Sequence, residues 1–352
     1  MILRETKILK VNPDLSGADD IEKLAFAADV LRKGGLVAFP TETVYGLGAN
    51  ALDENAVKSI FEAKGRAQDN PLIVHVSKKE DINKYAYAQN NKQADILLGE
   101  MPAPLTVILK KRDNIPLVVT AGLDNVAMRV PDNMVARKLI ELSGVPVSAP
   151  SANLSGKPSP TKAYHVIEDM QGKADVIIDG GDCQVGLEST VVTLCKEIPS
   201  LLRPGGFTYE RLCELLGKVD IADAVLSQLK EGQVPESPGM KYKHYAPKAK
   251  VVLVKGDVNR TRAFFEQKYN DKQNAFICFE GEFDKDEKRV IFVSARENVE
   301  EYAEKMFDAL RKTDKIDGIC TVYAVLPENT NGISLAIYNR MLRAAGFDVI
   351  EL

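Results

Sequence analysis

A stretch dense in proline and glycine, residues 218–249, divides the chain into two patterned parts. Its prolines and glycines are Gly232, Pro235, Pro238, Gly239 and Pro247. Residues of these types at this density disfavour regular structure, so we predict a linker with no strand before Lys250. The 352 residues then form two domains, a larger one at 1–217 and a smaller one at 250–352.

The two parts differ in how apolar residues are spaced. Residues 19–33 show the spacing of a helix and are followed by a short apolar run, 36–39, typical of a strand. Strands and helices in this first part do not alternate one for one, which favours an α/β fold with an open sheet of mixed direction. After residue 250 the alternation is regular and predicts a small three-layer α/β domain with a largely parallel sheet.

Several classes of protein are disfavoured by what the chain lacks. No apolar stretch has the 18 or more residues of a membrane-spanning helix, and we expect no membrane association. The five cysteines form no CxxC pair and the three histidines lie far apart, so neither a disulfide framework nor a metal cluster is predicted. We expect a reducing cytosol as the location. A net charge of −4 gives no case for a dedicated nucleic-acid binder.

Common nucleotide and hydrolase motifs are missing. No GxxxxGK[ST] loop and no GxSxG elbow occurs. Gly46, Gly48 and Ala51 match GxGxxA, but the first glycine lies six residues past Pro40, where the preceding strand ends. A dinucleotide fingerprint needs that glycine in the tight turn directly after the strand, so we assign it no such role.

Five polar segments follow or enter predicted strands in the first 206 residues. They are PTETVYGLG (40–48), KGR (64–66) with Asn70 and His75 after it, SAPSANLSG (148–156), GLESTVV (186–192) and LLRPGG (201–206). Each has an ordinary explanation alone: a polar turn, a helix end that favours cations, a core histidine, or a surface ion pair at Arg203. Together they indicate one pocket at a sheet edge. Such a pocket holds cations, hydroxyls and amides but no evident nucleophile, which suits phosphoryl or nucleotidyl transfer by positioning and electrostatic stabilisation.

These segments, together with NPLIVHV (70–76) and MRVP (128–131), resemble in order the YrdC-type threonylcarbamoyl-AMP synthases. SPGMKYKHYAP (237–247) and the small domain after it resemble the long, two-domain form. The resemblance implies an enzyme that joins ATP, L-threonine and bicarbonate into L-threonylcarbamoyl-AMP, diphosphate and water, for threonylcarbamoyladenosine modification of tRNA. It also implies a twisted open mixed sheet with a concave face and a Rossmann-like second domain.

The resemblance assigns roles residue by residue. The threonine-binding residues would be Thr43, His75, Arg129, Ser151 and Ser189. The ATP-binding residues would be Lys64, Arg66, Asn70, Asn125, Asn153, Thr161, Arg203, Tyr242 and His244, with Lys64 and Arg66 as the catalytic cations. Tyr242 or His244 would reach back from the linker over the nucleotide, and Lys241 could add charge. Mg²⁺ would enter with ATP, held mainly by phosphates and water.

Two other functions and one structural question stay open at this point. The chain could be an RNA-binding, translation-associated module, although it carries no RRM, KH or double-stranded-RNA motif. It could be a carbamoyl-transfer maturation factor, although it lacks the cysteine-rich zinc segments of such a protein. The segment 237–247 either docks on a ligand or packs against one domain. tRNA and the downstream threonylcarbamoyl transferase are further candidate partners.

Overall fold

The computed structural model describes residues 4–227, 245–285 and 288–352. Contacts divide the chain into two compact units, each described by itself below. The larger unit takes Met1–Ser155, Pro160–Gln184 and Glu188–Lys241, and the smaller takes Gly156–Ser159, Val185–Leu187 and Tyr242–Leu352. The smaller unit therefore includes two short segments that our prediction gave to the domain at 1–217.

The larger unit is built on a mixed sheet. Among the described residues it has eleven strands, in the order β1-β8-β2-β3-β7-β4-β6-β5-β9-β10-β11. β4 pairs with β6 in parallel, whereas β5 pairs with β6 antiparallel. The predicted mixed sheet is thus confirmed. The strands are β1 (Lys7–Lys10), β2 (Val37–Phe39), β3 (Gly46–Asn50), β4 (Ile73–His75), β5 (Leu105–Lys110), β6 (Asn125–Arg129), β7 (Val147–Ser148), β8 (Val176–Asp179), β9 (Thr190–Thr193), β10 (Ser200–Arg203) and β11 (Asp220–Ile221).

Helix α2 shows how local residues set the bounds of a helix in the larger unit. In α2 the Asp53 side chain accepts hydrogen bonds from the N–H groups of Asn55 and Ala56, and Gly65 ends the helix in the left-handed region, at φ 62°. Lys64 is therefore the last helical residue. The helices are α1 (Asp20–Arg32), α2 (Glu54–Lys64), α3 (Lys92–Gly99), α4 (Leu117–Thr120), α5 (Met134–Ser143), α6 (Ala163–Met170) and α7 (Tyr209–Leu216), with 3-10 turns at Lys79–Lys84 and Asp223–Val225.

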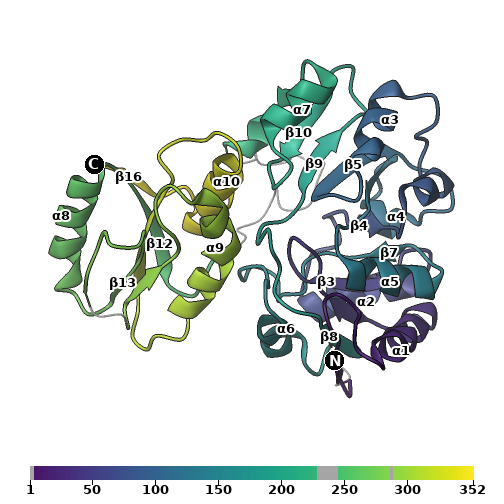
Figure 1. Cartoon of the computed structure of the whole chain (residues 1–352), viewed down its shortest axis with the longest axis horizontal. Coiled ribbons are helices and arrows are strands. Elements are labelled where there is room, and N and C mark those ends of the chain that lie inside the picture. The colour runs from purple at the N-terminus through teal and green to yellow at the C-terminus, as the bar shows by residue number, and fades with distance from the viewer. Residues whose placement is uncertain (1–3, 228–244, 286–287) are drawn as a thin grey trace. The chain divides into compact units, whose positions relative to one another are not determined.

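Helices α1 and α5 lie together against the sheet (Figure 1). Leu24 and Leu139, one from each helix, are fully buried against Phe39 and Val147. Burying one such side chain stabilises the fold by about 1.5–3 kcal/mol. This core supports β2 and β7, the strands from which the polar segments 40–45 and 148–153 emerge.

Two strands contradict the sequence prediction. Residues 46–48, expected as the end of a polar loop, begin strand β3. A Cβ at Gly48 would lie 2.7 Å from both Phe39 Cε1 and Val147 Cγ1, so glycine serves close packing there. The expectation that the linker, residues 218–249, contains no strand is also wrong. It contains β11, which pairs in parallel with β10.

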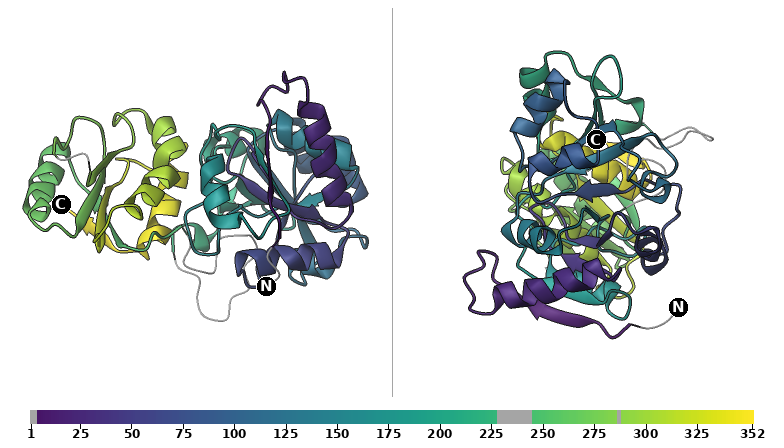
Figure 2. Two further views of the ribbon diagram at one scale, coloured as in Figure 1. Left: turned by 90° about the horizontal axis from the view of Figure 1, so that it is seen from below. Right: turned by 90° about the vertical axis from the view of Figure 1, so that its right-hand side faces the viewer.

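Within residues 245–285 and 288–352, the smaller unit contains five strands in the order β14-β13-β15-β12-β16, all paired in parallel. Helix α8 lies on one face of this sheet and α9 and α10 on the other (Figures 1 and 2), which confirms the three-layer prediction. The elements are β12 (Lys250–Lys255), α8 (Val258–Tyr269), β13 (Asn274–Cys278), β14 (Val290–Phe292), α9 (Val299–Thr313), β15 (Thr321–Val325), α10 (Ser334–Ala345) and β16 (Val349–Glu351). None of the helices in the described residues is long and apolar enough to cross a membrane.

Candidate active site

Buried polar atoms that make no hydrogen bond occur repeatedly near a few strand ends of the larger unit. In the described part of the chain they include atoms of Glu42, Asn70, His75, Arg129, Ser148 and Thr161. An unsatisfied buried donor or acceptor costs about 1–3 kcal/mol, so folded proteins keep few of them. A set of this size is typical of a site whose missing partners are supplied by a ligand.

Arg129 is the centre of the most charged part of this set. It ends β6 and is 4% exposed. Its Nη2 donates a hydrogen bond to Thr43 Oγ1 at 2.9 Å and lies 2.7 Å from Glu42 Oε1, an ion pair without the alignment of a hydrogen bond. Its Nε has no hydrogen-bond partner among the described residues. This edge of the guanidinium is therefore available to a carboxylate.

His75 lies beside Arg129, because the two residues are register partners in the parallel β4–β6 pair. Its ring is buried, and its Nδ1 has no hydrogen-bond partner in the described structure. Burial, together with the positive charge of Arg129, lowers the pKa of His75 to about 3. His75 is thus both a buried histidine and a member of the polar set, and it is neutral at physiological pH.

Replacing His75 by glutamine should flatten the dependence of stability on pH below neutrality. Between the unfolded pKa of about 6.5 and the folded pKa of about 3, only the unfolded chain takes up this proton. The stabilisation is complete above pH 6.5 and falls with acidity by up to about 1.4 kcal/mol per pH unit. Denaturant unfolding at pH 7, 6 and 5 measures it. Equal slopes for wild type and variant would contradict the prediction.

Ser189, which directly precedes β9, and Arg203, which ends β10, join the site. The Ser189 hydroxyl and Thr106 Oγ1 lie 2.8 Å apart, and Arg203 donates to the Ser189 carbonyl at 3.0 Å and hydroxyl at 3.2 Å. Val107 pairs with Met128, so the next step of this antiparallel ladder places Thr106 beside the end of β6. Arg203 is buried, which excludes the surface ion pair considered for it.

Replacing Gly205 by alanine should displace Ser189 and lower both stability and activity. A Cβ at Gly205 would lie 2.4 Å from Thr190 N and 2.6 Å from Glu188 O, which are backbone atoms. Overpacking of this kind costs about 1–3 kcal/mol. Gly99→Ala is the matched control, because a Cβ there meets nothing within 4 Å. Thermal unfolding and product formation should distinguish the two variants. A Gly205→Ala protein with wild-type stability and activity would disprove the expected clash.

Lys64 organises the loop after β7. Its side chain is buried, and its Nζ donates to the carbonyl oxygens of Ser151 and Asn153, the latter at 2.6 Å. It also lies 3.4 Å from Asn153 Oδ1, which accepts from Ser151 Oγ at 2.5 Å. An ammonium has three donors, and here each has an acceptor in the protein. A phosphate at Lys64 would therefore share this ammonium with the loop.

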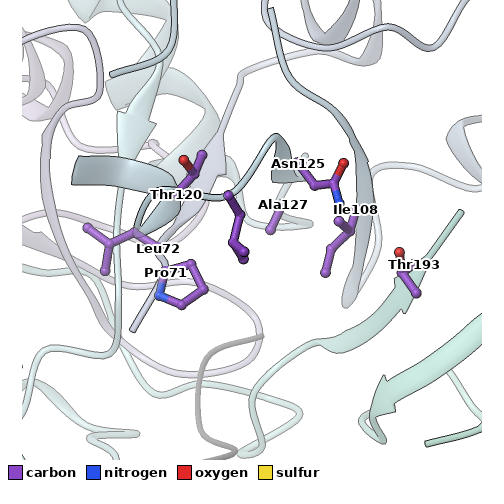
Figure 3. Close-up of a pocket in the computed structure, with 8 residues that line it drawn as sticks. Pro71, Leu72, Ile108, Thr120, Asn125, Ala127 and Thr193 are labelled. Atoms are coloured by element: carbon purple, nitrogen blue, oxygen red, sulfur yellow. The ribbon is translucent and has the colours of Figure 1, made fainter. Parts of the chain in front are cut away.

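Arg66 leads from the helix end to a hollow of about 100 Å³ (Figure 3). Its Nη2 lies 3.5 Å from the carbonyl oxygen of Asn70 and 3.4 Å from that of Pro71. Figure 3 shows Pro71 and Leu72 on one side of the hollow and Thr193 on the other. The lining also includes Ile108, Asn125 and Ala127. The hollow is apolar apart from an amide and hydroxyl groups.

The hollow and the Arg129 group lie at opposite ends of the same strands. Asn125 and Arg129 are four residues apart on β6, so they share a face of the sheet and are separated by about 13 Å. Likewise Leu72 precedes β4 and His75 ends it. Between the two ends lies an apolar cluster of Ile73, Ile108, Ala127, Val191 and Leu202. Arg129, with Thr43 and His75, and Asn125, in the hollow, are thus separated along the strands by an apolar band.

The remaining predicted residues fall into two classes. Thr161 is buried beside the segment 41–45, where its N–H donates to His165 Nδ1 at 3.3 Å and its neighbour Pro160 accepts from Tyr45 N. Tyr242, His244 and Lys241 lie outside the described residues.

Comparison with protein families covers both units. The family model described as "Telomere recombination" (Sua5_yciO_yrdC) matches residues 29–205. The model described as "Threonylcarbamoyl-AMP synthase, C-terminal domain" matches residues 207–346. The chain belongs to the threonylcarbamoyl-AMP synthase family. The RNA-binding module and the maturation factor are accordingly disfavoured as its main activity.

Relatives of this threonylcarbamoyl-AMP synthase align over nearly its whole length. It is 46% identical to the threonylcarbamoyl-AMP synthase of Pyrococcus abyssi over 94% of this chain and 96% of that protein. It is 41% identical to the Bacillus subtilis enzyme over 97% of each chain. The crystal structure of P. abyssi Sua5 complexed with L-threonine matches with a TM-score of 0.90 at 42% identity, covering 98% of this chain and 99% of that one.

Sequence reasoning missed one site residue of this synthase, Glu42. It stands in the polar segment PTETVYGLG and is 4% exposed beside Arg129. Acidic residues are almost never fully buried unless they are paired. The available signal was a carboxylate placed directly after a buried strand and matched by an arginine at the end of another.

Proposed function

We propose that the chain joins L-threonine, bicarbonate and ATP into L-threonylcarbamoyl-AMP, diphosphate and water along one face of its mixed sheet. The observation that carries this proposal is the pairing of a charged, buried group at Arg129 with an apolar hollow at Asn125 on the same strand. The first suits an amino acid and the second a nucleobase. A reaction between the two ligands needs both on one face.

Threonine is assigned to the Arg129 end. Its carboxylate would bind the Nε edge of Arg129, which has no partner among the described residues. Its other polar groups would use the remaining predicted partners, Thr43, His75, Ser151 and Ser189. Support comes from the buried hydroxyls of Thr43 and Ser189 and from neutral His75, which adds no second positive charge to the site.

ATP is assigned to the other end. The adenine would enter the hollow at Asn125, and the phosphates would then extend past Pro71 toward Arg66, whose guanidinium contacts the Pro71 carbonyl. Lys64 and Arg203 are the other proposed phosphate cations, with Asn70, Asn153 and Thr161 as polar partners. Tyr242 and His244 are proposed to cover the nucleotide. Mg²⁺ would arrive as the ATP complex, bound to phosphate oxygens and water.

The proposed chemistry needs no protein nucleophile. The threonine amine and bicarbonate form a carbamate, whose oxygen attacks the α-phosphorus while diphosphate leaves. Cations placed before the reaction starts stabilise the charge that develops on the leaving group. The adenylate would then be consumed in modification of an adenosine in tRNA, with tRNA or the downstream transferase as partner.

A product assay tests the proposal directly. The full chain is incubated with MgATP and bicarbonate, and with threonine or serine in parallel. We expect diphosphate release and a threonylcarbamoyl adenylate identified by mass, both dependent on bicarbonate. Arg66→Ala should reduce both without unfolding the chain. Absence of product with threonine, under conditions where ATP binding is measurable, would overturn the proposal.

A further inference from the structure

We propose that Glu42 binds the α-ammonium group of threonine and takes its proton, so that the freed amine can react with bicarbonate. This inference rests on the proposed function and assigns a catalytic role to a residue for which the motif resemblance gave none. It supplies the one group that the predicted site lacked, an acceptor for the ammonium proton.

The first argument is charge. Arg129 and Glu42 form an ion pair whose side chains are 5% and 6% exposed, so the pair has no net charge. Threonine enters as a zwitterion, which has no net charge either. If its carboxylate binds Arg129 Nε, its ammonium needs a nearby anion, because an unpaired buried charge is strongly unfavourable. Glu42 is the carboxylate that contacts this guanidinium in the described structure.

The second argument is hydrogen bonding. Both carboxylate oxygens of Glu42 are buried, and neither accepts a hydrogen bond from the described residues. Oε1 is near Arg129 Nη2, whose aligned hydrogen bond goes to Thr43. The threonine ammonium group carries three N–H donors on one nitrogen. It can donate hydrogen bonds to the Glu42 oxygens, which accept none from the described residues.

The third argument concerns the other titratable groups that face Glu42 and Arg129. His75, on β4, offers no negative charge to an ammonium group, and burial together with Arg129 lowers its pKa to about 3. Cys183, on the segment before β9, is within electrostatic range of Glu42, and burial raises the pKa of its thiol well above the usual range. Both are neutral near pH 7, so neither can pair with an ammonium group by charge. Glu42 is the carboxylate that contacts Arg129 in this cluster.

The proposed step balances as follows. A proton moves from the threonine ammonium to a Glu42 oxygen, which leaves a neutral amine and a carboxylic acid. The amine nitrogen bonds to the carbon of bicarbonate, the C–OH bond breaks, and hydroxide leaves as water with a second amine proton. The product is the carbamate anion, and Glu42 returns its proton to solvent before the next turnover.

The test compares three full-length variants with wild type. Glu42→Gln keeps the side-chain size and removes the charge, and Glu42→Asp keeps the charge. Glu282→Gln is the matched control, because Glu282 pairs with Arg296 at 2.5 Å in the smaller unit with its side chain 11% exposed. Calorimetry measures binding of L-threonine and of 2,3-dihydroxybutanoate, in which a hydroxyl replaces the ammonium. Product formation is followed from pH 6.5 to 9, and ATP binding reports folding.

We expect wild type, Glu42→Asp and Glu282→Gln to prefer threonine over its hydroxy analogue, and Glu42→Gln to lose that preference. Glu42→Gln should lose at least about 100-fold in kcat/KM for threonine near neutrality. Part of this should return with rising pH, as more threonine exists as free amine, whereas a merely structural defect would lower the rate equally at all pH values.

Two outcomes would overturn the inference: a Glu42→Gln protein that still prefers threonine, or one whose loss of rate does not change with pH. If Glu42→Gln fails to bind ATP, Glu42→Asp decides alone. A Glu42→Asp protein that still prefers threonine over its hydroxy analogue but reacts more slowly supports the inference. A Glu42→Asp protein that loses this preference refutes it. A wild-type chain that makes no threonylcarbamoyl adenylate would instead count against the proposed function.

Discussion

Replacing Lys64 by methionine will remove nearly all threonylcarbamoyl-AMP formation and will weaken the fold as well. Methionine keeps the length of the side chain but takes the ammonium away from the carbonyl oxygens of Ser151 and Asn153. Hydrogen bonds from a charged donor contribute about 1.5–3 kcal/mol each, so we expect a loss of about 3 kcal/mol or more in the free energy of unfolding. Loss of a preorganised cation should lower turnover by at least about 100-fold.

Lys58→Met on the same helix is the control for this prediction. Lys58 pairs with Glu54 at 2.6 Å on the surface, with side chains 42% and 58% exposed. Exposed pairs contribute about 0–1 kcal/mol, so this variant should match wild type in both measurements. Denaturant unfolding gives the stability and diphosphate release gives the turnover. If Lys64→Met kept wild-type stability, Lys64 would not be what anchors the loop.

The fold could be predicted where local signals agree with tertiary contacts. For α2 such signals are local: the cap at Asp53 and the glycine stop at Gly65 mark where the helix begins and ends. The glycines of β3 misled the prediction, because their reason for being glycine lies in residues distant in sequence. Gly48 makes room for Phe39 and Val147, and no local pattern reveals that contact. β11 is two residues long with both side chains exposed, so it carries no apolar pattern at all.

The candidate site could likewise be predicted only in part from the sequence. Motifs identified the segments that contain its polar residues, but the arrangement of those residues depends on strand register. His75 faces Arg129 because β4 and β6 pair in parallel, a fact that sequence spacing does not contain. Lys64 was predicted as a phosphate ligand, and the structure adds that it holds Ser151 and Asn153. A cation that binds the loop and a phosphate at once links loop position to nucleotide binding.

Replacing Arg129 by methionine will abolish use of threonine and will destabilise the chain strongly. The change removes the proposed carboxylate ligand and leaves Glu42 buried with no counter-charge. Breaking a buried ion pair by removing one partner costs about 3–5 kcal/mol, mostly because the remaining charge is uncompensated. Thr43 also loses the donor to its hydroxyl. Chemical denaturation and the product assay measure the two effects separately.

The double variant Glu42→Gln/Arg129→Met distinguishes the cost of an orphaned charge from the loss of a favourable contact. With the carboxylate gone, no buried charge remains unpaired, so the double variant should recover more than half of the stability lost by Arg129→Met. Contacting residues give such non-additive effects, whereas independent ones add within about 0.3–0.5 kcal/mol. Activity should stay absent, because both proposed threonine contacts are missing. Additive losses of stability would mean that Glu42 and Arg129 are not coupled in the folded chain, and the pair would then offer no basis for recognising a zwitterion.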